Sequence, residues 1–405
     1  MSNISGQKNA YEKVKYNNAA LVYQLIDLNG PISRVNIVQK SDLAPASVTN
    51  LTRQLMKHNL VSELSQEAST GGRPAIALTT NQKDFYFVSC RLGRTDIHSS
   101  LMDLAGNIIF HHITPILSHD AGNIVATLKQ EISQCLSCSN QKNLIAISVT
   151  MAGLVDTNTG LVNYSPNHQI GGLNLISSLN HFGLPVFIGN DIRALALAEY
   201  YLGHARQCDD FILVTIHGGI GAGIVSNGNL LSGKQRTVGE IGHVQIDPFG
   251  EQCHCGNFGC LETLVSNDAI VSRTSQLIKR GHPTILSNQT LSVETICQAA
   301  ESGDEVAIHI VEETARYLGQ VLSTLVNLFN PEKVLLAGEI IQNSKKILFP
   351  VLQTQIERQA LNKFNKEMHL CMAKYQKQGT MGGYALVKRA MHNGELLSKI
   401  LETQS

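Results

Sequence analysis

Residues 218–262 carry the three motifs that decide the fold, and the motifs follow one another closely. In order they read Gly218-Gly219-Ile220-Gly221-Ala222-Gly223, Val238-Gly239-Glu240-Ile241-Gly242-His243 and Cys253-His254-Cys255-Gly256-Asn257-Phe258-Gly259-Cys260-Leu261-Glu262. The last motif spaces three cysteines as C-x-C-x4-C, and His243 lies ten residues before the first of them. Three thiolates and one imidazole are the ligand set of a closed tetrahedral zinc site.

This ligand set predicts one structural Zn²⁺ per chain, bound by His243, Cys253, Cys255 and Cys260. Four protein ligands leave no open coordination position, so a catalytic metal is not expected. The alternative is a cluster of reduced thiols without a metal. His254 stands between two of the cysteines, and we expect it to face solvent rather than to act as a fifth ligand.

The composition is typical of an ordinary globular chain. Its 405 residues, 43% of them hydrophobic, suggest two or three domains. No apolar run approaches the roughly 20 residues of a membrane span, and residues 1–8 lack the apolar segment of a secretory signal. Nine cysteines, three of them in a metal spacing, fit a reducing compartment, so we predict a cytoplasmic protein. A further C-x-x-C pair, Cys135 and Cys138, is interpreted as an incidental spacing on a helix.

The charge of the chain is distributed unevenly. The formal net charge is zero. Residues 1–80 nevertheless contain eight Lys or Arg and five Asp or Glu, a difference of +3 that leaves −3 for the remainder. A mildly basic N-terminal region on an acidic body is expected if only that region contacts DNA.

Helical periodicity and turn signals predict a helix-turn-helix in residues 18–59. Apolar residues recur at helical spacing from Asn18 to Leu28, and Asn29-Gly30-Pro31 ends that helix. Ser33 can cap a second helix through Lys40, and a third helix is expected over residues 47–59. In such a motif the last helix enters the major groove of DNA.

A β-hairpin wing is expected behind the third helix. Residues 60–64 and 75–78 are its predicted strands, and Ser69-Thr70-Gly71-Gly72-Arg73-Pro74 is the connecting loop. An extended Arg73 is suited to a narrow minor groove, where negative potential concentrates. The alternative is that Arg73 anchors a linker between domains.

The exposed side of the third helix supplies the other expected DNA contacts. Amides pair with adenine edges and arginine pairs with guanine, so Asn50, Arg53 and Gln54 are the expected base readers. Lys57 and Arg34 are expected to contact phosphates. The full set of predicted DNA-binding residues is Arg34, Ser47, Thr49, Asn50, Arg53, Gln54, Lys57 and Arg73.

From residue 85 on, predicted strands alternate with predicted helices. The first set comprises strands over residues 85–90, 97–103, 108–114, 144–150 and 186–189 and a helix over 192–202. The second set comprises strands over residues 211–216, 223–226, 333–337 and 368–373 and a helix over 314–329. A final helix over 381–393 is expected to return to the first set. Two such α/β lobes imply a cleft for a small ligand.

These patterns divide the chain into three predicted parts. Residues 1–82 are expected to form a winged helix-turn-helix domain. Residues 83–194 together with 381–405 are expected to form the first α/β lobe. Residues 195–380 are expected to form the second lobe, with the zinc-binding hairpin and the helices that mediate oligomerisation.

Residues 85–391 resemble the ROK family of repressors, open reading frames and sugar kinases. The resemblance rests on the three motifs of residues 218–262, in their order and close spacing. It implies a two-lobed, actin-like (ASKHA) ATPase-type fold of the α/β class. Together with the N-terminal helix-turn-helix, the whole chain is similar to the transcriptional repressors of this family. The supporting stretches are residues 44–49, 68–73, 91–94 and 191–199.

The chain departs from the sugar kinases of the family at one loop. The kinases carry Asp-x-Gly-Gly-Thr there, which handles the ATP phosphates and Mg²⁺, whereas this chain reads Arg91-Leu92-Gly93-Arg94-Thr95. An arginine cannot coordinate Mg²⁺, and phosphoryl transfer depends on positioning and charge neutralisation. We therefore predict no enzymatic activity, although Asp191 retains the position of the kinases' catalytic base. The glycine run at residues 218–223 is interpreted as backbone packing.

The resemblance also implies a sugar-binding site. Carboxylates and an imidazole suit sugar hydroxyl groups because they accept the hydrogen bonds that a sugar donates. His243 would bind zinc through one ring nitrogen and face the sugar with the other. Gly153 and Ser165 would lie near the 2-substituent of an N-acetyl sugar. The sugar-binding residues that the resemblance implies are Gly153, Ser165, Asn190, Asp191, Glu240, His243 and Glu262.

Within the family, the chain is most similar to repressors that respond to N-acetylglucosamine 6-phosphate and control genes of amino-sugar uptake and catabolism. Arg91 or Arg94 is our hypothesis for the residue that binds the phosphate; alternatively, both form structural ion pairs. Operator DNA, bound by a homodimer or homotetramer, is the expected macromolecular partner. Two rival interpretations are a glucose-responsive repressor sequestered by a membrane sugar transporter, and a sugar kinase with an appended DNA-binding domain.

Overall fold

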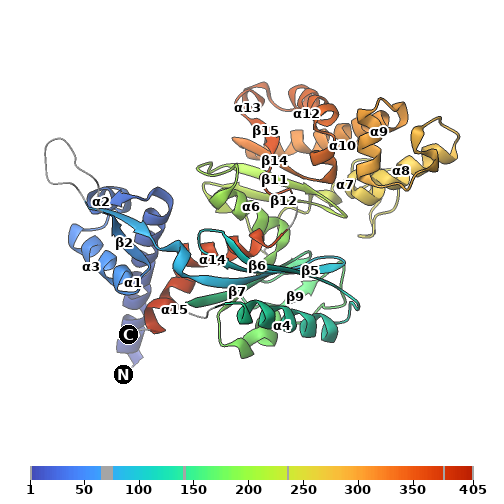
Figure 1. The fold of residues 1–405 in the computed structure, drawn as a ribbon. Coiled ribbons are helices and arrows are strands. Elements are labelled where there is room, and N and C mark those ends of the chain that lie inside the picture. The colour runs from blue at the N-terminus through green and yellow to red at the C-terminus, as the bar shows by residue number, and fades with distance from the viewer. Residues whose placement is uncertain (1, 65–75, 140–142, 235–236, 377–378, 404–405) are drawn as a thin grey trace. The chain divides into compact units, whose positions relative to one another are not determined.

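The computed structural model describes residues 2–64, 76–139, 143–234, 237–376 and 379–403 (Figure 1). The chain divides into two compact units. Unit 1 comprises Met1–Met151, Thr157–Gly189 and Gly383–Ser405. Unit 2 comprises Ala152–Asp156 and Asn190–Gly382. None of the helices in these ranges is both long and apolar enough to span a bilayer.

The N-terminal part of unit 1 consists of three helices and a small antiparallel sheet. The helices are α1 (Ser2–Asn29), α2 (Arg34–Ser41) and α3 (Pro45–Lys57), and the strand order is β1-β3-β2, from Ile32–Ser33, Ala77–Thr80 and Val61–Leu64. Ser33 caps α2 by accepting a hydrogen bond from the Asn36 backbone N–H. Val48, Leu51 and Leu55 form the buried side of α3. The helix expected from Asn18 begins earlier, at Ser2.

The rest of unit 1 is built on a five-stranded mixed sheet of order β10-β7-β4-β5-β6. Helix α4 packs on one face of this sheet, and α14 packs on the other, where Tyr384 contacts Phe87 (Figure 1). The strands are β4 (Tyr86–Leu92), β5 (Asp96–Asp103), β6 (Ile108–Pro115), β7 (Leu144–Met151) and β10 (Val186–Asn190). The other elements are η1 (Gln82–Asp84), α4 (Ala121–Ser137), β9 (Val162–Tyr164), α5 (Leu175–Leu179), η2 (Asn180–Phe182), α14 (Met381–His392) and α15 (Glu395–Thr403).

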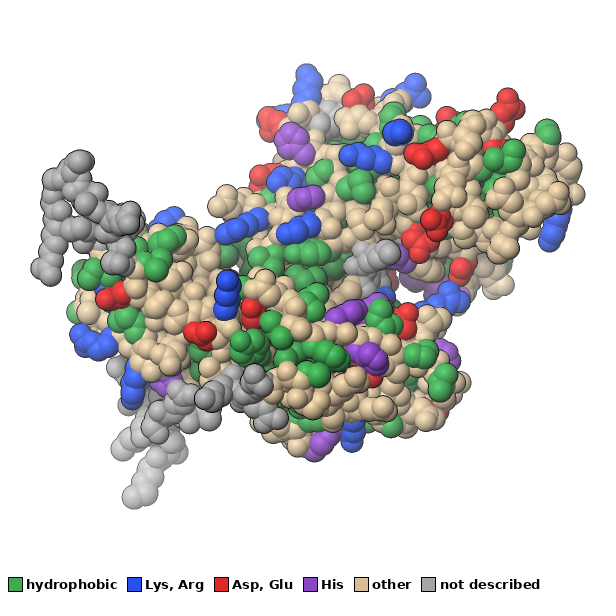
Figure 2. Space-filling model, in the orientation of Figure 1, with side chains coloured by type: hydrophobic (Ala, Val, Ile, Leu, Met, Phe, Trp, Pro, Cys, Tyr) green, Lys and Arg blue, Asp and Glu red, His purple; other side chains and the backbone are tan. Residues whose placement is uncertain are grey.

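Strand β6 forms one edge of this sheet, and its outer face is exposed. Ile109 and Ile113 are each about half exposed, at 53% and 50%, and His111 lies between them on the same face. Figure 2 shows hydrophobic and histidine side chains at the surface over the region of β5 and β6. On the opposite face, His112 Nδ1 lies 3.0 Å from Glu131 of α4, so that side of β6 is packed.

Unit 2 contains a second five-stranded sheet, of order β13-β12-β11-β14-β15. Its strands are β11 (Phe211–Ile216), β12 (Ile220–Ser226), β13 (Asn229–Leu230), β14 (Lys333–Gly338) and β15 (His369–Met372), with β8 (Leu154–Val155) outside the sheet. Its helices are α6 (Asp191–Leu202), η3 (Ile241–His243), α7 (Leu261–Val265), α8 (Asn267–Lys279), η4 (Ile285–Asn288), α9 (Val293–Glu301), α10 (Glu305–Phe329), α11 (Glu339–Asn343), α12 (Lys345–Gln359) and α13 (Asn362–Asn365).

Two elements of unit 2 begin earlier than the sequence predicts. Helix α10 starts at Glu305 rather than Thr314, because Asp304 caps it by accepting from the Ala307 backbone N–H. Strand β12 starts at Ile220, so the glycine run is partly in a strand. A Cβ atom on Gly223 would overlap the Cβ of Ala196, so glycine is what allows α6 to approach β12.

The C-x-x-C pair lies at the end of α4. Cys135 is buried in the helix, Cys138 is the exposed C-cap, and both thiols are free. Among the described residues, neither belongs to a group of side chains that could hold a metal ion.

Candidate metal centre and carboxylate cluster

The cysteine motif of unit 2 folds as a short hairpin ahead of α7. The Cys253 backbone N–H donates to the Asn257 carbonyl at 2.7 Å, and the Gly256 N–H donates back to the Cys253 carbonyl at 2.9 Å. Isolated bridges pair Gln252 with Phe258 and Gln245 with Cys260. Cys260 is the N-cap residue of α7, so the last cysteine of the motif leads directly into the helix that carries Glu262.

Gly259 is required where the hairpin turns into α7. Its φ of +60° lies in the left-handed region, which side chains other than glycine adopt rarely. A Cβ at this position would also overlap the carbonyl oxygen of Asp247. The close approach lets the Gly259 carbonyl accept hydrogen bonds from the backbone N–H groups of Ile246 and Asp247, at 2.7 and 3.1 Å.

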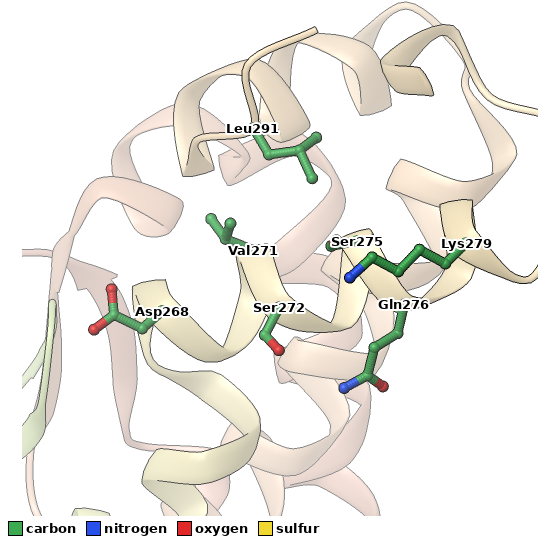
Figure 3. Close-up of a pocket in the computed structure, with 7 residues that line it drawn as sticks. All are labelled: Asp268, Val271, Ser272, Ser275, Gln276, Lys279 and Leu291. Carbon is green, nitrogen blue, oxygen red and sulfur yellow. The ribbon is translucent and has the colours of Figure 1, made fainter. Parts of the chain in front are cut away.

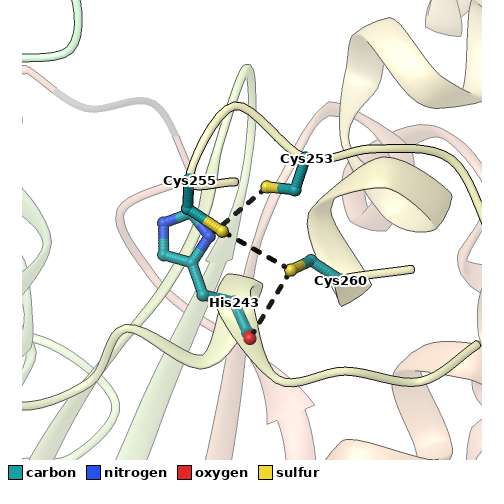
Figure 4. A group of neighbouring side chains, drawn as sticks. All are labelled: His243, Cys253, Cys255 and Cys260. Carbon is teal, nitrogen blue, oxygen red and sulfur yellow. Dashed lines mark hydrogen bonds between the residues drawn. The ribbon is translucent and has the colours of Figure 1, made fainter. Parts of the chain in front are cut away.

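The ligand atoms of His243, Cys253, Cys255 and Cys260 all lie within 4.8 Å of one another (Figure 4). Cys255 Sγ is 3.7 Å from Cys260 Sγ, and Cys253 Sγ is 3.6 Å from His243 Nδ1. A tetrahedron with zinc–sulfur bonds of about 2.3 Å has edges of about 3.8 Å. The donor set and its spacing therefore fit a tetrahedral metal ion, and His243 presents its Nδ1 atom to that position.

The thiols of this cluster differ in acidity in the metal-free chain. Burial raises the pKa of the Cys260 thiol to about 12, whereas a hydrogen bond from the Asn257 backbone lowers the pKa of Cys255. Because zinc binds thiolates, a bound cation would supply the charge that stabilises the buried Cys260 thiolate. Metal binding and the folding of this hairpin are thus expected to be coupled.

Three carboxylates of unit 2 gather beside the metal cluster. Desolvation raises the pKa of Glu240, and the neighbouring carboxylates of Glu262 and Asp191 raise it further. Asp191 is itself 5% exposed. Convergent acceptor groups of this kind suit a polyhydroxylated ligand, because each can accept from a ligand hydroxyl.

Glu262 is held in place from two sides. The backbone N–H of Ile220 donates to its Oε2 at 3.2 Å, and His254 Nδ1 lies 3.1 Å from its Oε1. The His254 side chain is 52% exposed and thus partly faces solvent. Its contact with Glu262 was missed at the sequence level, since no spacing rule connects residues 254 and 262 before the hairpin is folded.

Asn190 and Asp191 stand at the N-terminus of α6. Asn190 is the N-cap, and its Oδ1 accepts from the backbone N–H groups of Ile192 and Arg193, both at 3.1 Å. Its Nδ2 donates to the Gly153 carbonyl at 3.2 Å, which brings the predicted Gly153 beside this helix end. The structure therefore brings together six of the seven predicted sugar-binding residues within unit 2.

The remaining predicted ligand contacts belong to unit 1. Arg91 is the penultimate residue of β4, opposite His98 of β5, and its Nε is buried. Arg94 is exposed in the following turn. His168 Nε2 lies 2.7 Å from the Gly93 carbonyl oxygen and supports that turn, a role the sequence did not indicate. The buried Oγ of Ser165 has no hydrogen-bond partner among the described residues.

The predicted DNA-contacting residues lie mostly on the open side of α3. Ser47, Thr49, Asn50, Arg53 and Lys57 are exposed, and Gln54 is half-buried. Arg34 pairs with Glu63 at 2.7 Å and also donates to Thr52 Oγ1, so it ties α2 to α3 and β2. Arg73 lies outside the described residues.

Comparison with known proteins identifies the family. Residues 87–390 match the model of the ROK family. The chain belongs to the ROK family. It is 43% identical to the DNA-binding transcriptional dual regulator NagC of Escherichia coli K12, over 392 residues that cover 96% of each chain. It is 36% identical to the E. coli K12 repressor Mlc, over 96% of this chain and 97% of Mlc.

Among solved structures, the chain superposes on a ROK-family transcriptional regulator described as a homologue of E. coli Mlc. The TM-score is 0.89 at 40% identity, covering 96% of this chain and 100% of the other. The resemblance inferred from the motifs is thereby confirmed. The predicted fold class is confirmed as well, since an N-terminal helical region precedes two mixed sheets of the ROK type.

One surface depression of this ROK chain lies apart from the predicted sites. It has a volume of about 630 Å³ and is lined mainly by α8 (Figure 3). Its lining residues are Asp268, Val271, Ser272, Ser275, Gln276, Lys279 and Leu291. Gln276 also donates to Glu251 of the cysteine hairpin at 3.3 Å, so this face of α8 helps to hold the hairpin.

Proposed function

We propose that this chain is a sugar-responsive transcriptional repressor that binds operator DNA and is released by N-acetylglucosamine 6-phosphate. The observation that carries the proposal is the 43% identity to NagC over 96% of both chains. The convergence of the buried Asp191 with Glu240 and Glu262 in unit 2 supports a sugar ligand. The regulated genes in this proposal are those of amino-sugar uptake and catabolism, and the regulator acts in the cytoplasm as a homodimer or homotetramer.

The proposal assigns separate roles to the two groups of ligand residues. Asn190, Asp191, Glu240, His243 and Glu262 bind the sugar ring, and Gly153 and Ser165 lie near the N-acetyl group. The unpartnered, buried Ser165 hydroxyl supports a ligand contact there, since a buried polar atom without a partner costs about 1–3 kcal/mol. Arg91 or Arg94 binds the 6-phosphate.

The metal in this proposal is one Zn²⁺ bound by His243, Cys253, Cys255 and Cys260. A closed four-ligand site supplies no open coordination position, so its contribution is to stiffen the hairpin and to orient His243 and Glu262. The absence of an aspartate at position 91 supports a regulator without kinase activity. Ligand binding then lowers operator affinity because the ligand prefers the DNA-free state.

Replacing Arg91 or Arg94 with alanine is expected to separate phosphate recognition from sugar recognition. Loss of a charge-assisted contact of about 1.5–3 kcal/mol weakens N-acetylglucosamine 6-phosphate binding about ten- to hundredfold in at least one of the two variants. The affinity for unphosphorylated N-acetylglucosamine should stay within about twofold. Isothermal titration calorimetry measures both ligands, and unchanged sugar-phosphate affinity in both variants contradicts the phosphate assignment.

Glu240→Gln is expected to weaken sugar-phosphate binding about ten- to hundredfold, because an amide replaces a charged acceptor that neighbours Asp191 and Glu262. The measurement is the same calorimetric titration. Glu305→Gln is the matched control, since Glu305 is an exposed carboxylate of the same unit, at the start of α10, and belongs to none of the predicted sites. Equal sugar-phosphate affinities for the two variants would show that Glu240 does not bind the ligand.

Operator release under a panel of ligands tests the proposed function itself. The full-length protein is bound to DNA that it selects from a random pool, and N-acetylglucosamine 6-phosphate, glucose 6-phosphate and the free sugars are titrated in. Release by the first ligand alone is the expected result. Release only by a membrane sugar-transport protein favours the Mlc-like alternative, and steady ATP consumption with a sugar favours a kinase.

A further inference from the structure

A buried carboxylate joins the N-terminal part of unit 1 to helix α14. Asp27, in the last turn of α1, has a side chain that is only 1% exposed. Lys388 Nζ of α14 lies 2.9 Å away, and His392 Nε2 of α14 lies 2.7 Å away. The Lys388 and His392 side chains are 5% and 4% exposed. We refer to Asp27, Lys388 and His392 as the Asp27 joint.

Neutral donors complete the hydrogen bonds of the joint. Thr80 Oγ1 of β3 donates to Asp27 Oδ1 at 3.1 Å, and Gln82 Nε2 donates to it at 2.7 Å. Lys388 also donates to the Leu104 carbonyl at 3.2 Å. The joint therefore holds together the first helix, the wing strand β3 and the body of unit 1 at one point.

Helix α14 connects this joint to the boundary between the two units. The chain passes from unit 2 to unit 1 between Gly382 and Gly383, in the first turn of α14. Gly383 packs directly on the sheet, because a Cβ there would overlap Ser89 Oγ of β4. One helix thus begins where the chain passes from unit 2 to unit 1 and ends at the contact with α1.

Stability alone does not explain an ion pair at this position. Burying a charge pair costs desolvation energy, and apolar side chains of similar volume often serve stability equally well. What a buried, multiply bonded ion pair adds is a fixed geometry, because its directional contacts favour one arrangement of the joined elements. A repressor that binds a two-fold operator needs such a fixed arrangement, since its DNA-binding domains must match the half-site spacing.

We propose that the Asp27 joint positions the winged helix on the body of the protein for binding to a two-site operator, and that α14 carries the effect of ligand binding to this joint. The second part rests on the proposed release by sugar phosphate. The first part requires only that the protein binds DNA as an oligomer. Lys388 and His392 are positioning residues in this scheme, because both are buried and belong to neither the predicted DNA contacts nor the predicted sugar contacts.

The test compares the full-length Lys388→Met and wild-type proteins on two DNA fragments. One fragment carries the complete operator that the wild type selects from random DNA, and the other has one half-site scrambled. Arg389→Met is the matched control, because Arg389 is the exposed neighbour of Lys388 on the same helix. Affinity for N-acetylglucosamine 6-phosphate is measured in parallel by calorimetry.

Lys388→Met is expected to bind the complete operator at least about tenfold more weakly, because the linked binding domains lose effective concentration at the second half-site. Half-site affinity and sugar-phosphate affinity are expected to stay within about twofold, which shows that both binding regions remain folded. The proposal would be overturned if Lys388→Met bound the complete operator with wild-type affinity and sugar phosphate released it from DNA as it releases the wild type.

Two further outcomes separate this proposal from others. If Lys388→Met loses half-site binding, the substitution has damaged the winged helix. The His392→Asn variant, which leaves the Asp27–Lys388 pair in place, is then tested in the same way, by comparing its affinities for the complete operator and for the half-site. If sugar phosphate fails to release the wild type from DNA, the proposed inducer is wrong. Comparing the affinities for the complete operator and for the half-site still tests whether the Asp27 joint positions the winged helix.

Discussion

A Cys260→Ser protein is expected to lose its metal and, with it, its response to sugar phosphate. Cys260 is fully buried, and its thiol lies 3.7 Å from that of Cys255. A serine hydroxyl is a poor zinc ligand, and structural zinc sites contribute about 10–16 kcal/mol of apparent binding energy in small zinc-finger domains. Loss of one ligand should therefore remove most of the stabilisation that the metal gives to this hairpin.

The effect on the sugar site follows from the position of Cys260 in the chain. Cys260 is the N-cap of α7, and Glu262 lies in the first turn of that helix. His243, the fourth proposed metal ligand, also belongs to the predicted sugar contacts. We expect zinc content near zero and sugar-phosphate affinity lowered at least about a hundredfold, which corresponds to about 2.7 kcal/mol.

Zinc content is measured by elemental analysis and sugar-phosphate affinity by calorimetry. Cys138→Ser is the control, because Cys138 is an exposed thiol at the end of α4. Half-site DNA binding should survive in the Cys260 variant, since the winged helix has its own core of Val48, Leu51 and Leu55. A Cys260→Ser protein with full zinc content would refute the proposed ligand set.

Asp27→Ala is expected to lower the free energy of unfolding of unit 1 by about 3–5 kcal/mol, because it leaves the buried Lys388 without its counter-charge. A double Asp27→Leu, Lys388→Leu variant should recover most of this loss, since it removes both charges. Urea unfolding monitored by circular dichroism measures the effect. Asp84→Ala, at an exposed carboxylate, should stay within about 0.5 kcal/mol of the wild type.

Asp27 also makes the stability of the protein depend on pH in the acid range. Burial by itself raises the pKa of Asp27, but the hydrogen bond from His392 and the charge of Lys388 outweigh it and hold the pKa far below its ordinary value. A carboxyl group with a lowered folded-state pKa stabilises the fold above its unfolded pKa of about 3.9 and loses that contribution as the pH falls further. The wild type should therefore lose stability below about pH 4 more steeply than Asp27→Ala.

Local spacing explains why the clustering of the four candidate metal ligands could be predicted from the sequence. Its four ligands lie within 18 residues, and the turns between them depend on nearby residues such as Gly259. The capped helix α2 and the strand β11 were predictable for the same reason. In contrast, helices α4, α8, α9 and α12 went unpredicted, although their apolar faces pack in the cores of the two units.

The sequence by itself determined the family, the four side chains that could hold a metal ion and the N-terminal helical region, because these depend on short motifs and on periodicity. Only the tertiary structure decided which distant residues meet. Asp27 and Lys388 are 361 positions apart, and no local pattern marks them as partners. His254 faces Glu262 only once the hairpin has folded onto α7. Such contacts form because burial forces charged groups to find partners, and the chain's topology determines which partners are within reach.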